Sequence, residues 1–289
     1  MPTRNRSRLL DRLLTSISRL GYSDFEVIVV DDGSADDTAG VAERHRRDGL
    51  PLQYLHQDWA MMGAARNRGA AQARGDILAF TDDDCVVDPN WLRELARVFA
   101  EQPDVLGVQG RTVTDHAAMT PFTRQIEQLQ AGQPYRTCNI AYRTGVVREL
   151  GGFDPLLIRG EDVVMGMRVL ERGAIAFAPD AIVIHPPRPK EWADRRAWRT
   201  LLESELHFKS TYPQYAAARS QTLSVQRADH VFSRWLLLPL RRYWRWHWGY
   251  LRRHPTAYAR QVPRIVREKL ALFSLLPYFL SRWRTLNIK

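Results

Sequence analysis

The sequence has little cysteine and no long apolar run. Its 289 residues include two cysteines, Cys85 and Cys138, which provide no disulfide framework, and no set of Cys and His has zinc-site spacing. The longest uncharged apolar run, residues 270–281, is about half of the ~20 residues that a membrane-spanning helix needs. The first residues lack the apolar stretch of a secretory signal peptide. We therefore expect a protein of the reducing cytoplasm without a spanning helix.

Lysine is absent from residues 1–187, and the two parts of the chain differ in the sign of their charge. Residues 1–187 hold 21 Arg against 26 Asp and Glu, a net charge of −5. Residues 188–289 hold 21 Lys and Arg against 6 Asp and Glu, a net charge of +15. A change of this size indicates two regions with different partners. We predict one domain over residues 1–187 and a basic extension over residues 188–289.

Two kinds of apolar segment alternate along the first region. Leu and Ile recur at helical spacing over residues 9–20, and an Ala-rich helix is predicted over residues 64–74. Residues 25–30 are a short apolar run, the pattern of a parallel strand that is buried on both faces, and the apolar run 77–80 is predicted to be a further buried strand. The alternation of strands and helices predicts a doubly wound α/β layer.

Three consecutive carboxylates, those of Asp82, Asp83 and Asp84, follow the apolar run 77–80. Like charges at a strand end repel one another, and folding does not require them there. Mg²⁺ or Mn²⁺ takes hard oxygen ligands and keeps positions open for substrate phosphates, and open α/β sheets bind ligands at this edge. The pattern favours a divalent-metal site. A solvated acidic turn or a helix cap is the alternative.

Further motifs accompany the triple Asp in a fixed order. They are Pro2-Thr3-Arg4-Asn5-Arg6, Val30-Asp31-Asp32-Gly33-Ser34, Ala65-Arg66-Asn67-Arg68-Gly69, Asp82-Asp83-Asp84, Cys138–Arg143 followed by Gly151-Gly152-Phe153-Asp154, and Gly160-Glu161-Asp162 followed by Arg168. In this order and spacing, residues 1 to about 187 resemble the family 2 glycosyltransferases with the GT-A fold. The resemblance implies a GT-A-like mixed sheet. It also implies an inverting transferase that moves a sugar from a nucleotide-diphosphate sugar to a hydroxyl acceptor, in cell-envelope or polysaccharide synthesis.

The resemblance assigns a nucleotide pocket to the first two motifs. The residues expected in it are Pro2, Thr3, Arg4, Asp31 and Asp32. An aspartate carboxylate there can accept a hydrogen bond from a base N–H, and the choice between Asp31 and Asp32 stays open. A turn formed with Gly33 and Ser34 is the alternative role of both carboxylates.

Arg66 and Asn67 lie at the start of a predicted helix and, by the resemblance, contribute to donor binding. An arginine can bind a diphosphate or a carboxylate through two parallel hydrogen bonds. A surface arginine on a basic helix face is the alternative.

The resemblance places Asp84 directly on Mg²⁺ or Mn²⁺ and Asp82 at the ribose or in the metal shell. The cation would neutralise the charge that develops on the leaving diphosphate. Asp83 is grouped with the donor-site residues, although its side chain is expected to point away because neighbouring strand residues face opposite sides. His185, which ends another β-branched run, is predicted to complete the metal shell or to meet the diphosphate. A structural role for this histidine is the alternative.

Glu161 and Asp162 form a second acidic site. The pKa of a sugar hydroxyl lies far above 7, so its attack on an anomeric carbon needs a carboxylate that takes the proton. By the resemblance Asp162 is this base in a single displacement, with Glu161 as the substitute candidate. The alternative is that both acids only stabilise the start of a helix, whose dipole favours negative charge.

The resemblance also implies a β-strand directly before Pro2, where the sequence has only Met1. Loss of that strand would leave two neighbouring strands unpaired. The first strand is predicted to be truncated, so we expect either a true start upstream of Met1 or a weakened fragment, and we favour the first.

Arginine and tryptophan are interleaved in the basic extension. Seven of the nine tryptophans lie in it, namely Trp192, Trp198, Trp235, Trp244, Trp246, Trp248 and Trp283. Such a composition favours helices at an anionic membrane surface, with aromatic rings at headgroup depth. A helical subdomain packed on the transferase core and a nucleic-acid surface are alternatives, and nucleic acid is the least favoured. We expect a mainly α-helical extension, a peripheral place on the inner face of the cell membrane, and a glycan or lipid-linked acceptor.

Two other functions fit part of the pattern. A nucleotidyltransferase also presents an Asp-x-Asp motif, but it needs a Gly-rich loop with a lysine, and residues 1–187 contain no lysine. A non-catalytic membrane- or nucleic-acid-binding protein with a degenerate transferase domain fits the short N-terminus. The presence of Asp82, Asp84 and Asp162 argues against such decay.

Overall fold

The computed structural model describes residues 1–289 except 121, 133, 190–194, 216–247 and 275–289. The chain divides into two compact units. The first unit contains residues 1–117 and 125–187, and the second contains residues 118–124 and 188–289. Each unit is described separately below.

A parallel three-stranded sheet opens the first unit. Its strands, in the order β1-β2-β3, are β1 (Pro2–Thr3), β2 (Val27–Asp32) and β3 (Leu52–Gln57). A helix follows each strand, namely α1 (Ser7–Ile17), α2 (Thr38–Arg47) and α3 (Met61–Gln72). The predicted alternation of strands and helices is confirmed.

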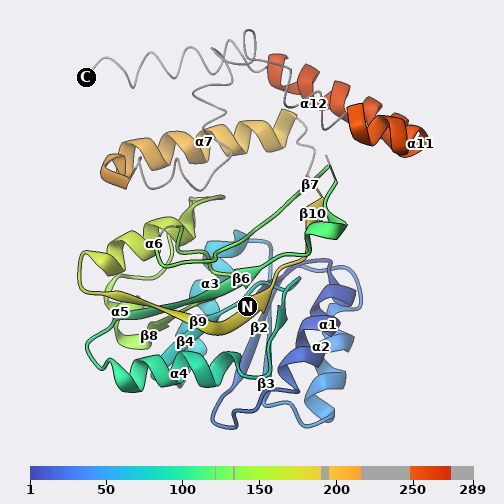
Figure 1. Ribbon diagram of the computed structural model, residues 1–289. Coiled ribbons are helices and arrows are strands. Elements are labelled where there is room, and N and C mark those ends of the chain that lie inside the picture. The colour runs from blue at the N-terminus through green and yellow to red at the C-terminus, as the bar shows by residue number, and fades with distance from the viewer. Residues whose placement is uncertain (121, 133, 190–194, 216–247, 275–289) are drawn as a thin grey trace. The chain divides into compact units, whose positions relative to one another are not determined.

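A mixed five-stranded sheet follows. In spatial order its strands are β4 (Ile77–Phe80), β8 (Ile140–Arg143), β6 (Gly107–Val113), β9 (Ile175–Ile184) and β5 (Val86–Val87). β6 and β9 are parallel, and the other neighbours are antiparallel. The helices of this part are α4 (Trp91–Glu101), α5 (Thr144–Glu149) and α6 (Glu161–Leu170). Figure 1 shows the strands in the interior of the first unit, between the helices. The helices α1, α2 and α4 contribute to one buried apolar cluster, and α3, α5 and α6 contribute to a second one.

The first strand is present but short. β1 pairs in parallel with β2, with Pro2 opposite Val30. The Met1 amino group donates a hydrogen bond to the Ile28 carbonyl at 2.8 Å, which extends the pairing back to the first residue. Among the described residues, β1 belongs to the three-stranded sheet and β4 to the five-stranded sheet.

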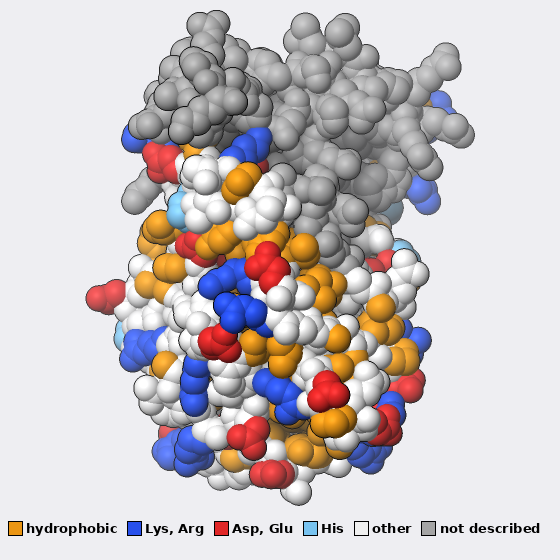
Figure 2. Space-filling model, turned by 90° about the vertical axis from the view of Figure 1, so that its left-hand side faces the viewer, with side chains coloured by type: hydrophobic (Ala, Val, Ile, Leu, Met, Phe, Trp, Pro, Cys, Tyr) orange, Lys and Arg blue, Asp and Glu red, His pale blue; other side chains and the backbone are white. Residues whose placement is uncertain are grey.

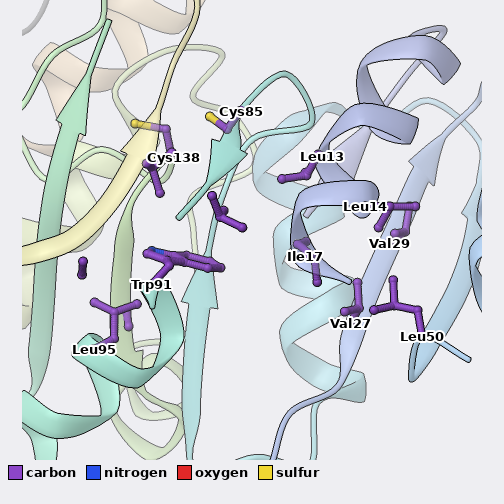
Figure 3. Packing of buried hydrophobic residues seen from close by; sticks show 14 of the residues in the cluster. Leu13, Leu14, Ile17, Val27, Val29, Leu50, Cys85, Trp91, Leu95 and Cys138 are labelled. Atoms are coloured by element: carbon purple, nitrogen blue, oxygen red, sulfur yellow. The ribbon is translucent and has the colours of Figure 1, made fainter. Parts of the chain in front are cut away.

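The core of the first unit lies between α1, α4 and the strands. Leu10, Leu13, Leu14 and Ile17 recur at helical spacing and are at most 3% exposed. Figure 3 shows Leu14 beside Val29 and Ile17 near Val27 of β2, whereas Leu13 points toward the other side of the same cluster, where Cys85, Cys138 and Trp91 of α4 lie. This packing fixes the strands whose ends carry the acidic residues.

Charged and apolar side chains are intermixed on the surface of the first unit. Figure 2 shows Lys and Arg, Asp and Glu, and hydrophobic side chains side by side on the face drawn there. The acidic excess of residues 1–187 is therefore spread over this face and does not form one negative area.

The described part of the second unit is mainly helical. Its elements are β7 (Thr123–Arg124) paired antiparallel with β10 (Arg188–Pro189), and the helices α7 (Arg195–Thr211), α11 (Pro255–Ala259) and α12 (Val262–Ser274). Phe122 packs against Tyr250 and Tyr258, with ring centres 5.6 and 5.3 Å apart. In the described ranges, no helix has both the length and the apolarity to cross a bilayer. The predicted helical character of the extension is confirmed for this part.

Most of the extension's tryptophans lie outside the described residues. They are Trp192, Trp235, Trp244, Trp246 and Trp283. Trp248 is described and 51% exposed, with the Arg252 guanidinium 5.3 Å from its ring centre.

Candidate active site

The loops that follow β1 and β4 meet through an arginine. Arg6, after β1, donates a hydrogen bond from Nη1 to Asp83 Oδ1 at 3.0 Å, and the same nitrogen lies 3.9 Å from Asp84 Oδ2. Asp83 is 4% exposed, and its burial raises the pKa of the carboxyl. The positive charge of Arg6 lowers this pKa, but the effect of burial is larger. The side chain of Asp83 is thus engaged inside the protein by Arg6, which also lies near Asp84.

Asp31 lies at the end of β2 and is 1% exposed. Its oxygens accept hydrogen bonds from the Ser34 amide at 2.8 Å and from the Tyr54 hydroxyl at 2.5 Å, and His56 Nδ1 lies 3.4 Å away. Burial raises the pKa of Asp31, but these hydrogen bonds together outweigh it and leave the pKa below its ordinary value. Asp31 therefore stays ionised.

Asp32 has a different set of partners. One of its oxygens accepts hydrogen bonds from Gln57 Nε2 and from the Ala60 amide, both at 2.8 Å, and the other accepts one from the Met61 amide at 2.9 Å. Two of these three donors are backbone N–H groups at the start of α3. The first N–H groups of a helix have no acceptor within the helix, and Asp32 provides one for them. Asp32 holds the start of α3 in place.

Pro2, Thr3 and Arg4 differ in exposure. Pro2 and Thr3 are buried, whereas Arg4 is exposed. The Arg4 guanidinium lies 4.9 Å from the ring centre of Trp59, which is 52% exposed and follows β3. Trp59 could not be predicted from the sequence, because no motif or spacing links this residue to Arg4.

Arg66 joins the two acidic sites. It is 4% exposed and donates from Nη1 to Glu161 Oε1 at 2.6 Å and from Nη2 to Asp82 Oδ1 at 3.2 Å. A buried guanidinium needs such partners, because an unpaired charge inside a protein is costly. This bridge was not foreseen, since Glu161 lies 95 residues from Arg66 in the sequence.

Asn67 bonds to the backbone of Phe153. Its Nδ2 donates to the Phe153 carbonyl at 2.8 Å and its Oδ1 accepts from the Phe153 amide at 2.7 Å. A Cβ at Gly152, whose φ is +77°, would lie 2.3 Å from Asn67 Oδ1, so the close approach requires glycine there. Asn67 thereby ties α3 to the segment that leads to α6.

Glu161 and Asp162 begin α6, directly after Gly160. Glu161 is 4% exposed, whereas Asp162 is half-buried and accepts a hydrogen bond from the Val163 amide at 2.8 Å. Burial raises the pKa of Glu161, and the charge of Asp162 adds to this rise while Arg66 opposes it. Burial also raises the pKa of Asp162. Asp162 is the more accessible of two carboxylates that hold a proton more tightly than usual.

A third group combines residues that are far apart in the sequence. Ligand atoms of Asp84, Cys85 and His185 all lie within 4.8 Å of one another. Within the described residues, the candidate metal group thus contains Asp84 and His185 but not Asp82, which faces Arg66. Cys85 was not singled out from the sequence, although it directly follows the triple Asp.

The surroundings of His185 fit a cation. His185 is 0% exposed, and its Nδ1 lies 2.9 Å from the Pro186 carbonyl oxygen, which can only accept a hydrogen bond. In the neutral ring Nε2 is then a bare acceptor, 3.5 Å from Asp84 Oδ1 and without a hydrogen-bond partner among the described residues. Two facing acceptors are unfavourable until a cation lies between them, so these residues suit a divalent metal.

The sequence comparisons identify the family. The model described as Glycosyl transferase family 2 matches residues 1–148. The chain belongs to this family. The glycosyltransferase AglE of Haloferax volcanii is 31% identical over 201 residues, which are 65% of this chain and 66% of the relative. The pre-mycofactocin glycosyltransferase of Mycobacterium tuberculosis is 33% identical over 222 residues, which are 68% of this chain and 44% of the relative. The chain therefore spans less than two thirds of the length of these curated relatives.

Solved structures share the fold. Residues 1–349 of S. aureus TarS, in complex with UDP-GlcNAc, match with a TM-score of 0.57 and 19% identity over 73% of this chain and 71% of that one. The mannosyltransferase PcManGT of Pyrobaculum calidifontis, in complex with GDP-Man and Mn²⁺, matches with a TM-score of 0.56 and 18% identity over 95% and 85%. The family and the GT-A-like fold expected from the motifs are confirmed. Membership of this family also removes the reason to consider a nucleotidyltransferase.

Proposed function

We propose that this chain is an inverting glycosyltransferase that moves a sugar from a nucleotide-diphosphate sugar to a hydroxyl of a glycan or lipid-linked acceptor. The observation that carries the proposal is the Arg66 bridge between Asp82 and Glu161. Through this bridge a single side chain, that of Arg66, contacts both the acidic group after β4 and the acidic pair that begins α6. A donor and an acceptor would thus meet at neighbouring carboxylates, as a single displacement requires.

The donor would bind at the ends of β1, β2 and β4. The ionised carboxylate of Asp31 can exchange a side-chain partner for an N–H of the nucleotide base, whereas Asp32 is already occupied by backbone amides. The exposed pair of Arg4 and Trp59 offers a flat apolar face and a positive charge beside this position. The nucleotide-sugar complexes of TarS and PcManGT support this class of donor.

Asp84 and His185 are the residues that would hold a divalent cation, with Asp82 at the ribose or at the edge of the metal shell. A bound cation supplies positive charge to the leaving nucleoside diphosphate. Arg6 adds a fixed positive charge beside the same carboxylates. The Mn²⁺ in the PcManGT complex supports a divalent ion in this fold.

Asp162 would act as the base. The acceptor oxygen attacks the anomeric carbon from the face opposite the diphosphate, the bond to the diphosphate oxygen breaks, and the hydroxyl proton passes to Asp162. Because the pKa of Asp162 is raised by burial, its carboxylate is a better proton acceptor than an ordinary aspartate. Glu161 is held by Arg66 and is less accessible.

Donor turnover tests this function. The chain is incubated with a panel of nucleotide sugars and Mg²⁺ or Mn²⁺, and release of nucleoside diphosphate is measured, with mass spectrometry and NMR of any product. We expect release from one class of donor and an inverted anomeric centre. No release from any donor, or a retained configuration, would contradict the proposal.

The second unit would bind an anionic membrane surface from the cytoplasmic side. Val262, Val266 and Leu270 are 43%, 50% and 64% exposed, and their spacing of four residues places them on one face of α12. Exposed Arg264 and Arg267 lie on the same helix. Helical spacing places Arg267 nearer to this apolar stripe and Arg264 on the opposite face of the helix. An apolar stripe with a cation near its edge suits shallow burial at a lipid surface, to which each cation in reach adds on the order of 1 kcal/mol.

Vesicle co-sedimentation tests this second role. The full chain should bind anionic vesicles, and added salt should weaken that binding because it screens the charges. Val262→Ser, Val266→Ser and Leu270→Ser together should remove the binding that persists at high salt. Equal binding to neutral and anionic vesicles, or none to either, would contradict a peripheral membrane role.

A further inference from the structure

Cys85 lies inside the candidate metal group, and the proposed function gives its thiol no role. The residue is 0% exposed, and Asp84 and His185 are 4% and 0% exposed. The Cys85 thiol is not in a disulfide. One ligand atom from each of the three residues lies within 4.8 Å of the others. Bonds of about 2.0–2.3 Å to one divalent ion bring its ligands to roughly 3–4 Å from each other, so small side-chain shifts would close this group around a cation.

The histidine is already oriented for such a role. Its Nδ1–H donates to the Pro186 carbonyl, which fixes the tautomer and directs the bare Nε2 toward Asp84. A hydrogen bond of this kind on the far nitrogen is the usual support of a metal-bound histidine. The unpartnered, fully buried Nε2 is therefore an observation independent of the thiol.

We propose that Cys85 Sγ is the third protein ligand of the divalent-cation site, beside Asp84 and His185. The inference rests on the same site as the proposed function and refines its metal chemistry. A set of one carboxylate oxygen, one imidazole nitrogen and one thiolate sulfur favours borderline and soft cations, such as Zn²⁺, Co²⁺ and Cd²⁺, over Mg²⁺. Binding forms a bond from sulfur to the cation and releases the thiol proton to solvent, with no change in oxidation state.

The competing explanation is that Cys85 is a small apolar core residue. It packs in the same buried cluster as Trp91 and Leu95 (Figure 3). Burial raises the pKa of the Cys85 thiol, so without a cation the side chain is neutral and compatible with that cluster. Only a signal that reports a sulfur–metal bond separates the two explanations.

Cys138 provides a matched control. It is 2% exposed, belongs to the same cluster, and lies with its Sγ 3.8 Å from Thr112 Oγ1. It is not a member of the group around His185. Cys85→Ser and Cys138→Ser therefore each remove one buried thiol, but only the first removes a proposed ligand.

The test is a titration of the full chain with Co²⁺ and with Cd²⁺, followed by ultraviolet and visible absorption and by calorimetry. The wild type and Cys138→Ser should develop a sulfur-to-metal charge-transfer band that saturates at one equivalent. Cys85→Ser should lack this band and should bind Cd²⁺ at least about tenfold more weakly, whereas its affinity for Mn²⁺ should change by less than about threefold. Circular dichroism of the metal-free variants checks folding, and Cys85→Ala replaces Cys85→Ser if the latter does not fold.

Three outcomes would overturn the proposal: a charge-transfer band that persists in Cys85→Ser, a band that disappears in Cys138→Ser instead, or cation binding by the wild type with no such band. Absence of cation binding by the folded wild type would overturn it as well. None of these readouts depends on sugar transfer. A thiolate band in a chain that turns over no donor would therefore uphold this site and contradict the proposed function.

Discussion

Two groups of acidic residues, one after β4 and one at the start of α6, differ in the positive charge around them. Asp83 and Asp84 lie beside the Arg6 guanidinium, and Asp84 also faces the His185 ring. Glu161 pairs with the Arg66 guanidinium, and the charges of Arg66 and Arg136 both act on Asp162. Burial nevertheless raises the pKa of each of these two carboxyls, as it does for Asp83. Carboxylates of the first kind are suited to hold a cation. Carboxylates of the second kind are suited to accept a proton.

The largest loss of sugar transfer is expected from a substitution in the group that would bind the cation. Asp84→Ala removes the carboxylate ligand from the group with His185, so transfer should fall by at least about 1,000-fold, the scale on which removal of transition-state charge stabilisation acts. The fold should persist, because the substitution relieves crowding of like charges. Nucleoside diphosphate release with added Mg²⁺ or Mn²⁺, together with thermal unfolding, measures both effects.

The exposed Asp104 provides a control for loss of one negative charge elsewhere on the first unit. Asp104→Ala should leave transfer unchanged. Metal-stimulated turnover that is undiminished in Asp84→Ala would remove this residue from the proposed metal site.

On the proton-accepting side, Asp162→Asn should lower transfer by at least about 100-fold, which is the scale of general-base catalysis. The donor should still bind, because the substitution leaves the groups at the ends of β1 and β2 in place. Calorimetry with the donor and a transfer assay separate the two effects.

Glu161→Gln provides the contrast, since Glu161 is less exposed and is held by Arg66. It should retain more transfer than Asp162→Asn. The reverse order of activities would move the role of base from Asp162 to Glu161.

The sequence allowed much of this comparison to be predicted, because both acidic groups are local motifs. Asp82-Asp83-Asp84 follows an apolar strand, and Glu161-Asp162 precedes a helix, so local spacing alone indicated each. Arg66 was also singled out, but as a contact of the diphosphate. Its partners Asp82 and Glu161 lie 16 and 95 residues away. Pairing over such separations depends on how the tertiary fold brings α3 close to the first residues of α6, which no local pattern encodes.

Position on the sheet also explains why the roles of Asp31, Asp32 and Cys85 could not be predicted from the sequence. Asp31 and Asp32 are adjacent, and the sequence left open which of them faces the nucleotide. In the structure their side chains have separate partners, because neighbouring strand residues face opposite sides. Cys85 directly follows a motif of obvious interest, yet a single cysteine carries no spacing signal. Its nearness to His185 follows from the pairing of β5 with β9.

Arg66→Met tests the link between the two acidic groups. It would leave Glu161 buried with no opposite charge, and breaking a buried ion pair in this way costs about 3–5 kcal/mol of unfolding free energy. Glu161→Gln in the same chain should recover part of that loss, because the unpaired charge is removed. Urea unfolding of the two single variants and the double variant gives the coupling energy. Additive losses would mean that the bridge contributes nothing as a pair.

The smallest expected effect is the pH dependence that Glu161 contributes to the stability of the chain. Because burial raises the pKa of Glu161 in the folded chain, the folded state binds more protons than the unfolded state at pH values above the ordinary glutamate pKa of about 4.3. The contribution of Glu161 to stability must then decrease as the pH rises from there to the raised pKa. Asp31, whose pKa is lowered, acts in the opposite direction and only below about pH 3.9, so it does not disturb this window. The free energies of unfolding of the wild type and Glu161→Gln, obtained from urea titrations between pH 4.5 and neutrality, should differ by an amount that changes with pH by about 1.4 kcal/mol for each unit by which the pKa of Glu161 is raised. Parallel curves would show that Glu161 titrates alike in both states, and the contrast between the two acidic groups would then rest on accessibility alone.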